Sequence, residues 1–322
     1  MFYRYFLSLG LCCLIASLSF AQQDQNLVPN GHFEDYYMCP DNISQIERLT
    51  AWNSWRVTPD YFNVCDSSNY MGVPINEVSF QDARSGSGYA GLIGLTTNNN
   101  REILGVELIT PLEVGEEYYV EFYWNRAFGG GFHYQCDCAS NRLGVLFTNH
   151  EYDFIDEEMP VTNNAHLYET ELMIDSVNWV KVSGWVEADS TYQYMAIGNF
   201  FDADSCETAY LNGNPDMDSF KSYYFIEDVC VATDPAICDL WNKVSEPENE
   251  SLQIERIGSD QIRLRGLSES SQLTIFDQSG RVLETRTVLP EELINTNHLA
   301  AGVYILSVES GESLVTGRFV KY

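Results

Sequence analysis

Short segments in which large apolar side chains recur at every second position constrain this chain more than any other feature. Between residues 117 and 128, Val120, Phe122 and Trp124 occupy alternate positions. Successive side chains of a strand point to opposite faces, so this spacing fits a β-strand and not a helix. Further strand-like segments are 92–95, 101–109, 142–148, 179–188, 192–200 and 222–232. Seven or more short strands without a long stretch of helical period predict an all-β fold, and a jelly-roll β-sandwich in particular.

The segment 117–128 also carries aromatic residues on its second face. Tyr119 and Tyr123 stand between the apolar residues of the first face. An antiparallel sheet with one face in water shows mostly polar residues on that face. We therefore expect a sandwich core on one side of this sheet and a concave surface lined by aromatic residues on the other.

The end of the sequence forms a separate group of strand-like segments with short motifs in a fixed order. These motifs are Leu273-Thr274-Ile275-Phe276-Asp277 with Gly280-Arg281-Val282, then Leu299 with Ala301-Gly302-Val303-Tyr304-Ile305-Leu306, and then the basic residues Arg318 and Lys321. The order resembles the C-terminal sorting domain, type A, of proteins that the type IX secretion system of Bacteroidota exports. Members of that family often begin this domain with Pro-Asn-Pro, where this chain has Glu246-Pro247-Glu248-Asn249.

This resemblance implies a small immunoglobulin-like β-sandwich at 252–322 that serves as an export signal. The family's sorting signal falls here on Gly302, Tyr304, Arg318 and Lys321. The resemblance further implies that the type IX secretion machinery is a partner, and that the protein crosses the periplasm to the outer-membrane surface or the medium. The alternative is an ordinary immunoglobulin-like sandwich without a sorting role.

The first 21 residues are typical of a signal peptide. Arg4 gives a positive start, residues 6–18 are apolar, and Ser19-Phe20-Ala21 has small residues at the −3 and −1 positions of a cleavage site. The apolar stretch is shorter than the ~20 residues that span a bilayer, and no later segment reaches that length. We expect a cargo domain at 22–240 and a linker rich in acidic residues at 241–251.

The charge of the chain is concentrated in the part before the sorting domain. Residues 22–244 hold 35 acidic and 9 basic residues, a net charge of −26 out of −30 for the whole chain. Such a field repels nucleic-acid phosphates and anionic lipids and favours divalent cations. The charge therefore excludes a nucleic-acid-binding protein.

Seven cysteines remain after residue 21, and all of them lie before residue 245. Disulfides are the expected state outside the cytoplasm, and an odd number leaves one thiol unpaired or bonded to another chain. Cys39 and Cys65 flank one loop-rich region, so we expect them to be bonded. Zinc at His133, Cys136 and Cys138 is disfavoured because no fourth ligand at a compatible spacing is evident.

Several motifs of the cargo domain resemble galactose-binding-like jelly rolls, the architecture of many carbohydrate-binding modules. They are Leu27-Val28-Pro29-Asn30-Gly31-His32-Phe33-Glu34, Ser87-Gly88-Tyr89-Ala90-Gly91-Leu92, Thr110-Pro111-Leu112-Glu113-Val114-Gly115 and Tyr223-Tyr224-Phe225-Ile226-Glu227-Asp228-Val229. The resemblance implies a structural Ca²⁺ held by Glu34 and Asp228 together with backbone carbonyls, since Ca²⁺ takes six to eight oxygen ligands. The alternative is two acids on a strongly acidic surface.

Sugar recognition uses flat aromatic rings against the apolar faces of pyranoses, with polar side chains hydrogen-bonded to the hydroxyl groups. The stretch Trp52–Tyr61 holds three aromatic residues beside Pro59 and Asp60, with little strand alternation, and we expect it to be an exposed loop. The candidate ligand-binding residues are Trp52, Trp55, Asp60, Tyr61, Asn63, Trp124, Arg126, Phe132 and Tyr134.

Two functions from different classes remain open. The first is a non-catalytic binding or adhesion module, exported to the cell surface or secreted, whose ligand is a neutral glycan or a surface protein. The second is a small polysaccharide-degrading enzyme, a glycosidase or lyase, on the same scaffold. No Gly-x-Ser-x-Gly elbow, His-Glu-x-x-His or phosphate-binding loop is present, which favours the first function. An acid pair in a groove, with one pKa raised, would favour the second.

Overall fold

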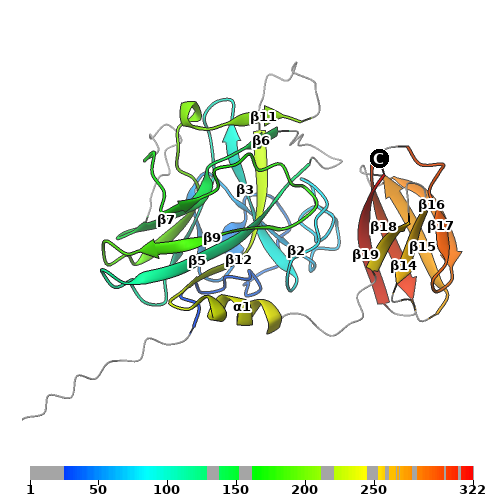
Figure 1. The fold of residues 1–322 in the computed structure, drawn as a ribbon, viewed down its shortest axis with the longest axis horizontal. Coiled ribbons are helices and arrows are strands. Elements are labelled where there is room, and N and C mark those ends of the chain that lie inside the picture. Colours follow the sequence, from blue (N-terminus) through cyan, green and yellow to red (C-terminus); the bar gives the residue numbers. More distant parts are fainter. Residues whose placement is uncertain are drawn as a thin grey trace, which may run out of the picture.

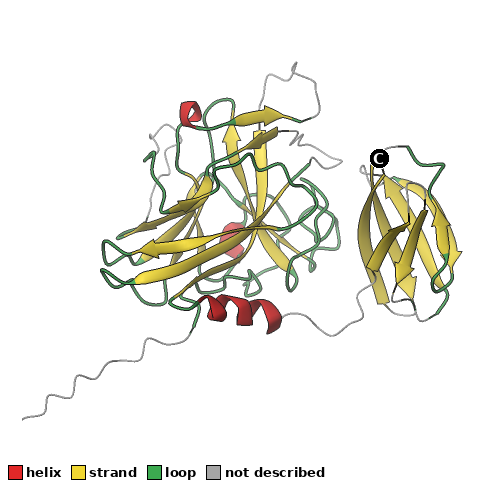
Figure 2. Cartoon of the chain, viewed as in Figure 1, coloured by secondary structure: helices red, strands yellow, loops and turns green. Residues whose placement is uncertain are grey.

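The computed structural model describes residues 25–128, 138–151, 162–211, 221–244, 253–257, 261–265, 267, 269–277, 281–300, 302–310 and 313–321. Strands make up most of the regular structure (Figure 2), as the alternating segments predict. The predicted all-β fold is confirmed. The strands before residue 233 and those after residue 252 belong to separate sheets, so the chain contains two β-sandwiches (Figure 1).

The first sandwich consists of two five-stranded antiparallel sheets. The first sheet has the order β1 (Trp52–Arg56), β4 (Ile103–Glu107), β10 (Tyr194–Asn199), β7 (Leu143–Thr148) and β8 (Leu167–Tyr168). The second sheet has the order β2 (Asp60–Asn63), β3 (Gly88–Thr96), β12 (Lys221–Ala232), β5 (Glu117–Arg126) and β9 (Val180–Glu187). Because sequence neighbours such as β1 and β2 lie in different sheets, the connections repeatedly cross between the two layers, as in a jelly roll.

Short elements complete this sandwich. They are the pair β6 (Cys138–Ser140) and β11 (Thr208–Tyr210), the 3-10 helices η1 (Ile46–Arg48) and η2 (Ala203–Ser205), and the helix α1 (Pro235–Val244). Helix α1 follows β12 and packs against it through Ile237 and Cys238. It extends past residue 240, where we expected the linker to begin.

The core lies between the two sheets and is built from one face of each strand. Val120, Phe122 and Trp124 of β5 all belong to it, with Leu104 and Val106 of β4 on the opposite sheet. All five are at most 3% exposed. The alternation in segment 117–128 therefore identified the inward face of β5 correctly.

The outer face of the second sheet is divided into a covered part and an open part. Over β2, β3 and β12, the aromatic residues Phe62, Tyr89 and Phe225 are buried beneath Met71 and Val78 of the segment 64–87. Over β9 the outward side chains reach solvent, as the alternating exposure along this strand indicates, and on β5 Tyr119 and Tyr123 are partly exposed whereas Glu121 is buried. The aromatic second face that the sequence predicts is thus exposed on only one half of the sheet.

The second sandwich is smaller and also antiparallel. One sheet has the order β13 (Gln253–Ile257), β14 (Gln261–Arg265) and β17 (Leu293–Asn295), and the other has the order β16 (Val282–Val288), β15 (Ser271–Asp277), β18 (Gly302–Ser310) and β19 (Ser313–Lys321). Its own core includes Leu273, Ile275, Leu306 and Val308, which alternate along β15 and β18.

Candidate functional site

The three aromatic residues chosen as sugar contacts are core residues. Trp52 and Trp55 lie on β1 and are 1% and 6% exposed, and Tyr61 lies on β2 and is fully buried. The indole of Trp52 donates a hydrogen bond to the carbonyl of Asn30 (2.9 Å), and the ring of Trp55 covers Gly105 so closely that a Cβ there would lie 1.8 Å from it. The prediction that this stretch is an exposed loop is wrong, because these three residues lie on strands and are buried. Buried rings cannot stack against a sugar.

The remaining candidates do not gather on one surface either. Trp124 lies in the core, Asn63 donates to the hydroxyl of Tyr61 (2.8 Å), and Arg126 donates to the carbonyl of Ala127 (3.0 Å). These three side chains are at most 7% exposed. Phe132 and Tyr134 lie outside the described residues.

Asp60 is the exception, because it lines a cavity of about 160 Å³ at the edge of the second sheet. The carboxylate of Asp60 accepts hydrogen bonds from the Ser44 amide and from the Tyr223 hydroxyl, both at 2.5 Å. Glu102, which directly precedes β4, lines the same cavity and accepts a bond from the Ile93 amide (2.7 Å). The remaining lining residues are Ile43, Val57, Thr58, Val78 and Lys221.

Burial changes the acidity of both carboxyl groups in this cavity. It raises the pKa of Asp60 to about 6, against the lowering effects of the Ser44 and Tyr223 hydrogen bonds and the Lys221 charge. Burial also raises the pKa of Glu102 well above its ordinary range, and the negative charge of Asp60 raises it further. The cavity thus holds an acid pair with raised pKa values, brought together from β2 and the start of β4.

The open part of the second sheet carries a second group of candidate ligand-binding side chains, which we call the β5–β9 face. It consists of Tyr119, Glu121, Tyr123, Lys181 and Trp185. Tyr119 lies opposite Trp185 across the two strands, and Tyr123 lies opposite Lys181. The Trp185 ring is 52% exposed and lies 5.6 Å from the ring of Tyr119 in an edge-on arrangement. An exposed indole beside a tyrosine is a surface against which an apolar ring face can stack.

Charged groups on the β5–β9 face are paired within the protein. The Lys181 ammonium lies 3.2 Å from the buried carboxylate of Glu121, and its own side chain is 38% exposed. The Arg84 guanidinium lies 3.5 Å from the centre of the Tyr123 ring. The face therefore combines aromatic rings with the Lys181–Glu121 ion pair, and the exposed Glu117 and Glu187, which lie opposite each other at its end, make it net negative. The alternation of Tyr119 and Tyr123 pointed to this face, but Trp185 on β9 was missed, although the alternating Val180, Val182 and Val186 of its segment leave Trp185 on the outward face.

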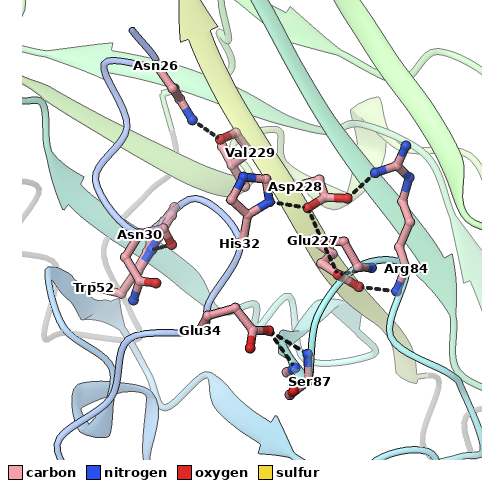
Figure 3. A network of polar contacts seen from close by, with 12 residues as sticks. Asn26, Asn30, His32, Glu34, Trp52, Arg84, Ser87, Glu227, Asp228 and Val229 are labelled. Atoms are coloured by element: carbon pink, nitrogen blue, oxygen red, sulfur yellow. Dashed lines mark hydrogen bonds and ion pairs between the residues drawn. The ribbon is translucent and has the colours of Figure 1, made fainter. Parts of the chain in front are cut away.

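Both predicted calcium ligands, Glu34 and Asp228, already accept hydrogen bonds from protein donors. The Glu34 carboxylate accepts bonds from the amides of Ser87 (2.6 Å) and Gly88 (2.9 Å). The Asp228 carboxylate accepts from the His32 ring (2.5 Å) and from the Arg84 guanidinium (Figure 3). A guanidinium on the Asp228 carboxylate repels a second cation, so these residues do not fit a calcium site as they are arranged here. Within the described part of the chain, no group of three or more His, Cys, Asp or Glu side chains could hold a metal ion.

Two disulfides join described residues of the first sandwich. Cys39 and Cys65 are bonded, as predicted. A second bond joins Cys230 of β12 to Cys238 of α1. Asp234 accepts a hydrogen bond from the Ala236 amide (2.9 Å) and Pro235 begins the helix, a combination of N-terminal signals that could have revealed α1 in the sequence.

The predicted sorting residues lie on the last two strands of the second sandwich. Gly302 begins β18, and Tyr304 follows on the same strand, stacked on Phe319 with ring centres 5.3 Å apart. The Lys321 ammonium is buried and donates to the carbonyl of Thr296, so its charge does not face the solvent. Arg318 lies on β19.

Comparisons with known proteins match the second sandwich. The family model "Secretion system C-terminal sorting domain" matches residues 247–322. No curated protein matches the chain. Among solved structures, the chain is similar to the Ruminococcus gnavus β-glucuronidase at 9% identity, with a TM-score of 0.18, over 89% of this chain and 47% of that chain. The chain thus spans about half the length of that enzyme, and a TM-score of this size carries no argument about fold or activity.

The match and the structure agree on the place of the export signal. The matched residues include all of β13 to β19, and the short motifs noted in the sequence fall on β15, β18 and β19. No helix among the described residues is long and apolar enough to cross a membrane. Residues 247–322 are therefore a secretion system C-terminal sorting domain, which marks this protein for export by the type IX machinery to the cell surface or the medium.

Proposed function

We propose that this protein is a non-catalytic binding protein that leaves the cell through its sorting domain and binds a neutral glycan on the β5–β9 face. The observation that supports the proposal most is Trp185, whose ring is 52% exposed and lies 5.6 Å from Tyr119. We also propose that residues 1–21 are removed as a signal peptide on entry into the periplasm.

The chemistry of the β5–β9 face fits an uncharged sugar better than a charged one. An apolar pyranose face stacks on an indole ring, and sugar hydroxyls can exchange hydrogen bonds with Lys181 and Ser183 at its side. Lys181 is already paired with Glu121, so little positive charge is left for an anionic polymer. The net charge of −26 on residues 22–244 adds a general repulsion against such polymers. Binding to a neutral glycan should therefore depend little on salt, because no counterions are released.

The test is a glycan array followed by titration calorimetry with the exported chain and the variant Trp185→Ala. Loss of the indole should weaken binding by about 1–2 kcal/mol, which is roughly a 5- to 30-fold rise in Kd. Tyr210→Ala is the matched control, because Tyr210 is an aromatic residue on β11 with 47% exposure that lies off this face. Equal affinity of wild type and Trp185→Ala would contradict the proposed site, and binding only to proteins would contradict the glycan ligand.

A polysaccharide-degrading enzyme is the second candidate, and the acid pair of Asp60 and Glu102 favours it. The pKa of about 6 at Asp60 suits a group that exchanges protons near neutral pH. Against it, Asp60 already accepts two hydrogen bonds, and the cavity of about 160 Å³ is smaller than most pockets that enclose a ligand of drug size. Release of reducing sugars by wild type but not by a folded Asp60→Asn variant would favour this second function over the first.

A further inference from the structure

The carboxylates of Glu34, Glu227 and Asp228 meet at the turn 84–88, which leads into β3 (Figure 3). Glu34 is far in the sequence from the adjacent residues Glu227 and Asp228. Glu34 accepts from the amides of Ser87 and Gly88, as described above. Glu227 of β12 accepts from the amides of Arg84 and Ser85, each at 2.6 Å. This turn thereby joins the first segment of the sandwich to its last strand.

Asp228 completes the junction through an irregularity in β12. Neighbouring residues of a regular strand point to opposite faces, yet Glu227 and Asp228 both contact Ser85. The strand has a register shift between Glu227 and Cys230, and Asp228 takes a left-handed backbone conformation with φ of 51°. This bulge turns the Asp228 side chain to the same side as Glu227, toward the turn 84–88.

Burial and neighbouring charges shift the pKa values of the two adjacent acids of β12 in opposite directions. Burial raises the pKa of Glu227 well above its ordinary range, and the neighbouring charge of Asp228 raises it further. Burial acts in the same direction on Asp228, but hydrogen bonds from His32 and Ser85 and the charges of His32 and Arg84 hold its pKa below the ordinary value. The Arg84 guanidinium, which contacts the buried Asp228 carboxylate, supplies its counter-charge at this junction.

Further contacts hold Arg84 in place. Its guanidinium lies 3.5 Å from the centre of the Tyr123 ring, and its backbone amide donates to Glu227. The Asp228 side chain is fully buried, so it cannot exchange its protein donors for water. Removing the partner of a buried carboxylate strongly destabilises a fold. The fold therefore depends on the positive group that contacts Asp228.

We propose that Arg84, assisted by His32, supplies the positive charge that holds Asp228 in place of a bound divalent cation. The first segment, the turn 84–88 and β12 are then joined without metal. The stability of this sandwich then does not depend on calcium.

The first experiment is thermal unfolding of the full chain in 5 mM EDTA and in 10 mM CaCl2, followed by tryptophan fluorescence. The six tryptophans are Trp52, Trp55, Trp124, Trp179, Trp185 and Trp241. None lies in the sorting domain, so the signal reports the first sandwich alone. We expect the two melting temperatures to agree within about 1 °C, whereas a ligand at 100 times its Kd would raise the melting temperature by roughly 5–10 °C. A lower melting temperature in EDTA would overturn the proposal.

The second experiment removes the internal cation. Arg84→Met should lower the melting temperature by about 5–10 °C, because it leaves the buried Asp228 carboxylate short of a counter-charge. Arg84→Lys keeps the positive charge and should lower the melting temperature less than Arg84→Met does. Arg48→Met is the matched control, since Arg48 pairs with the exposed Asp41 at 2.7 Å and such a pair contributes little.

A double variant separates charge from packing. Asp228→Asn removes the unpaired charge, and asparagine tolerates the left-handed backbone at this position. Arg84→Met with Asp228→Asn should therefore melt at a higher temperature than Arg84→Met alone. A double variant as unstable as Arg84→Met would overturn the proposal, whereas a double variant that folds where Arg84→Met does not would support it.

Discussion

At the scale of single residues, the acid pair of Asp60 and Glu102 links burial to pH dependence. Both side chains are at most 6% exposed, and both have pKa values above the ordinary range. The folded-state pKa of Asp60, about 6, exceeds its ordinary value of 3.8, so the folded protein binds this proton more tightly than the unfolded chain does. The resulting stabilisation is complete below about pH 4 and is lost as the pH rises through about 6. Glu102 acts in the same direction.

We therefore predict that Glu102→Gln raises the stability of the protein above neutral pH. Glutamine keeps an oxygen that can accept the bond from the Ile93 amide but carries no charge to bury. At pH 7.5 the free energy of unfolding should rise by about 1–2 kcal/mol, and the difference between wild type and variant should shrink toward pH 5. Urea unfolding at several pH values measures this, with the exposed Glu171→Gln as control. A variant that is less stable than the wild type at every pH would contradict the prediction.

At the scale of elements, the segment 52–63 shows why strand prediction failed locally. It forms two strands, β1 and β2, which lie in different sheets and are separated by only three residues. Val57 takes a left-handed conformation with φ of 56° at this corner. Strands of four or five residues are too short to show clear alternation, and the corner reverses which face points inward. By contrast, long strands such as β5 and β12 were found from the sequence almost to their ends.

The two disulfides should contribute unequally to stability. The sequence separation is 26 for Cys39–Cys65 and 8 for Cys230–Cys238. In the chain-entropy description, the longer loop stabilises by about 3.5 kcal/mol and the shorter one by about 2.6 kcal/mol. We predict that the double replacement Cys39→Ser with Cys65→Ser lowers the midpoint of urea unfolding more than Cys230→Ser with Cys238→Ser does. The opposite order would mean that the docking of α1 matters more than loop length.

At the scale of the whole molecule, export and binding lie in separate sandwiches. The family match ends at residue 322 and begins at residue 247, after the last element of the first sandwich, α1. No strand pairs across this boundary among the described residues. Each sandwich has its own buried apolar cluster, so each can remain folded when the other is changed.

We predict that deletion of residues 245–322 leaves the first sandwich folded but retained in the periplasm of a host with type IX secretion. Fractionation followed by immunoblotting measures the location, and tryptophan fluorescence of the periplasmic protein checks its fold. The full chain is the control and should reach the surface or the medium. Appearance of the truncated protein in the medium would contradict the assigned role of the sorting domain.

The sequence by itself determined the fold class, the positions of the long strands and the sorting domain. These depend on local information, because alternation along one strand reflects burial of one face and the sorting motifs lie within a single small sandwich. The bonded pair Cys39–Cys65 was also predictable, since both cysteines flank the same region.

Only the tertiary structure decided which side chains are available to a ligand. Segment 64–87 folds over β2, β3 and β12 and buries their outer aromatic residues, while the β5–β9 face stays open. In the same way, Asp60 meets Glu102, and Arg84 reaches Asp228, across long separations in the sequence. Such contacts depend on how strands from distant segments are ordered in the sheets, and a one-dimensional pattern of apolar and polar residues carries no information about that order.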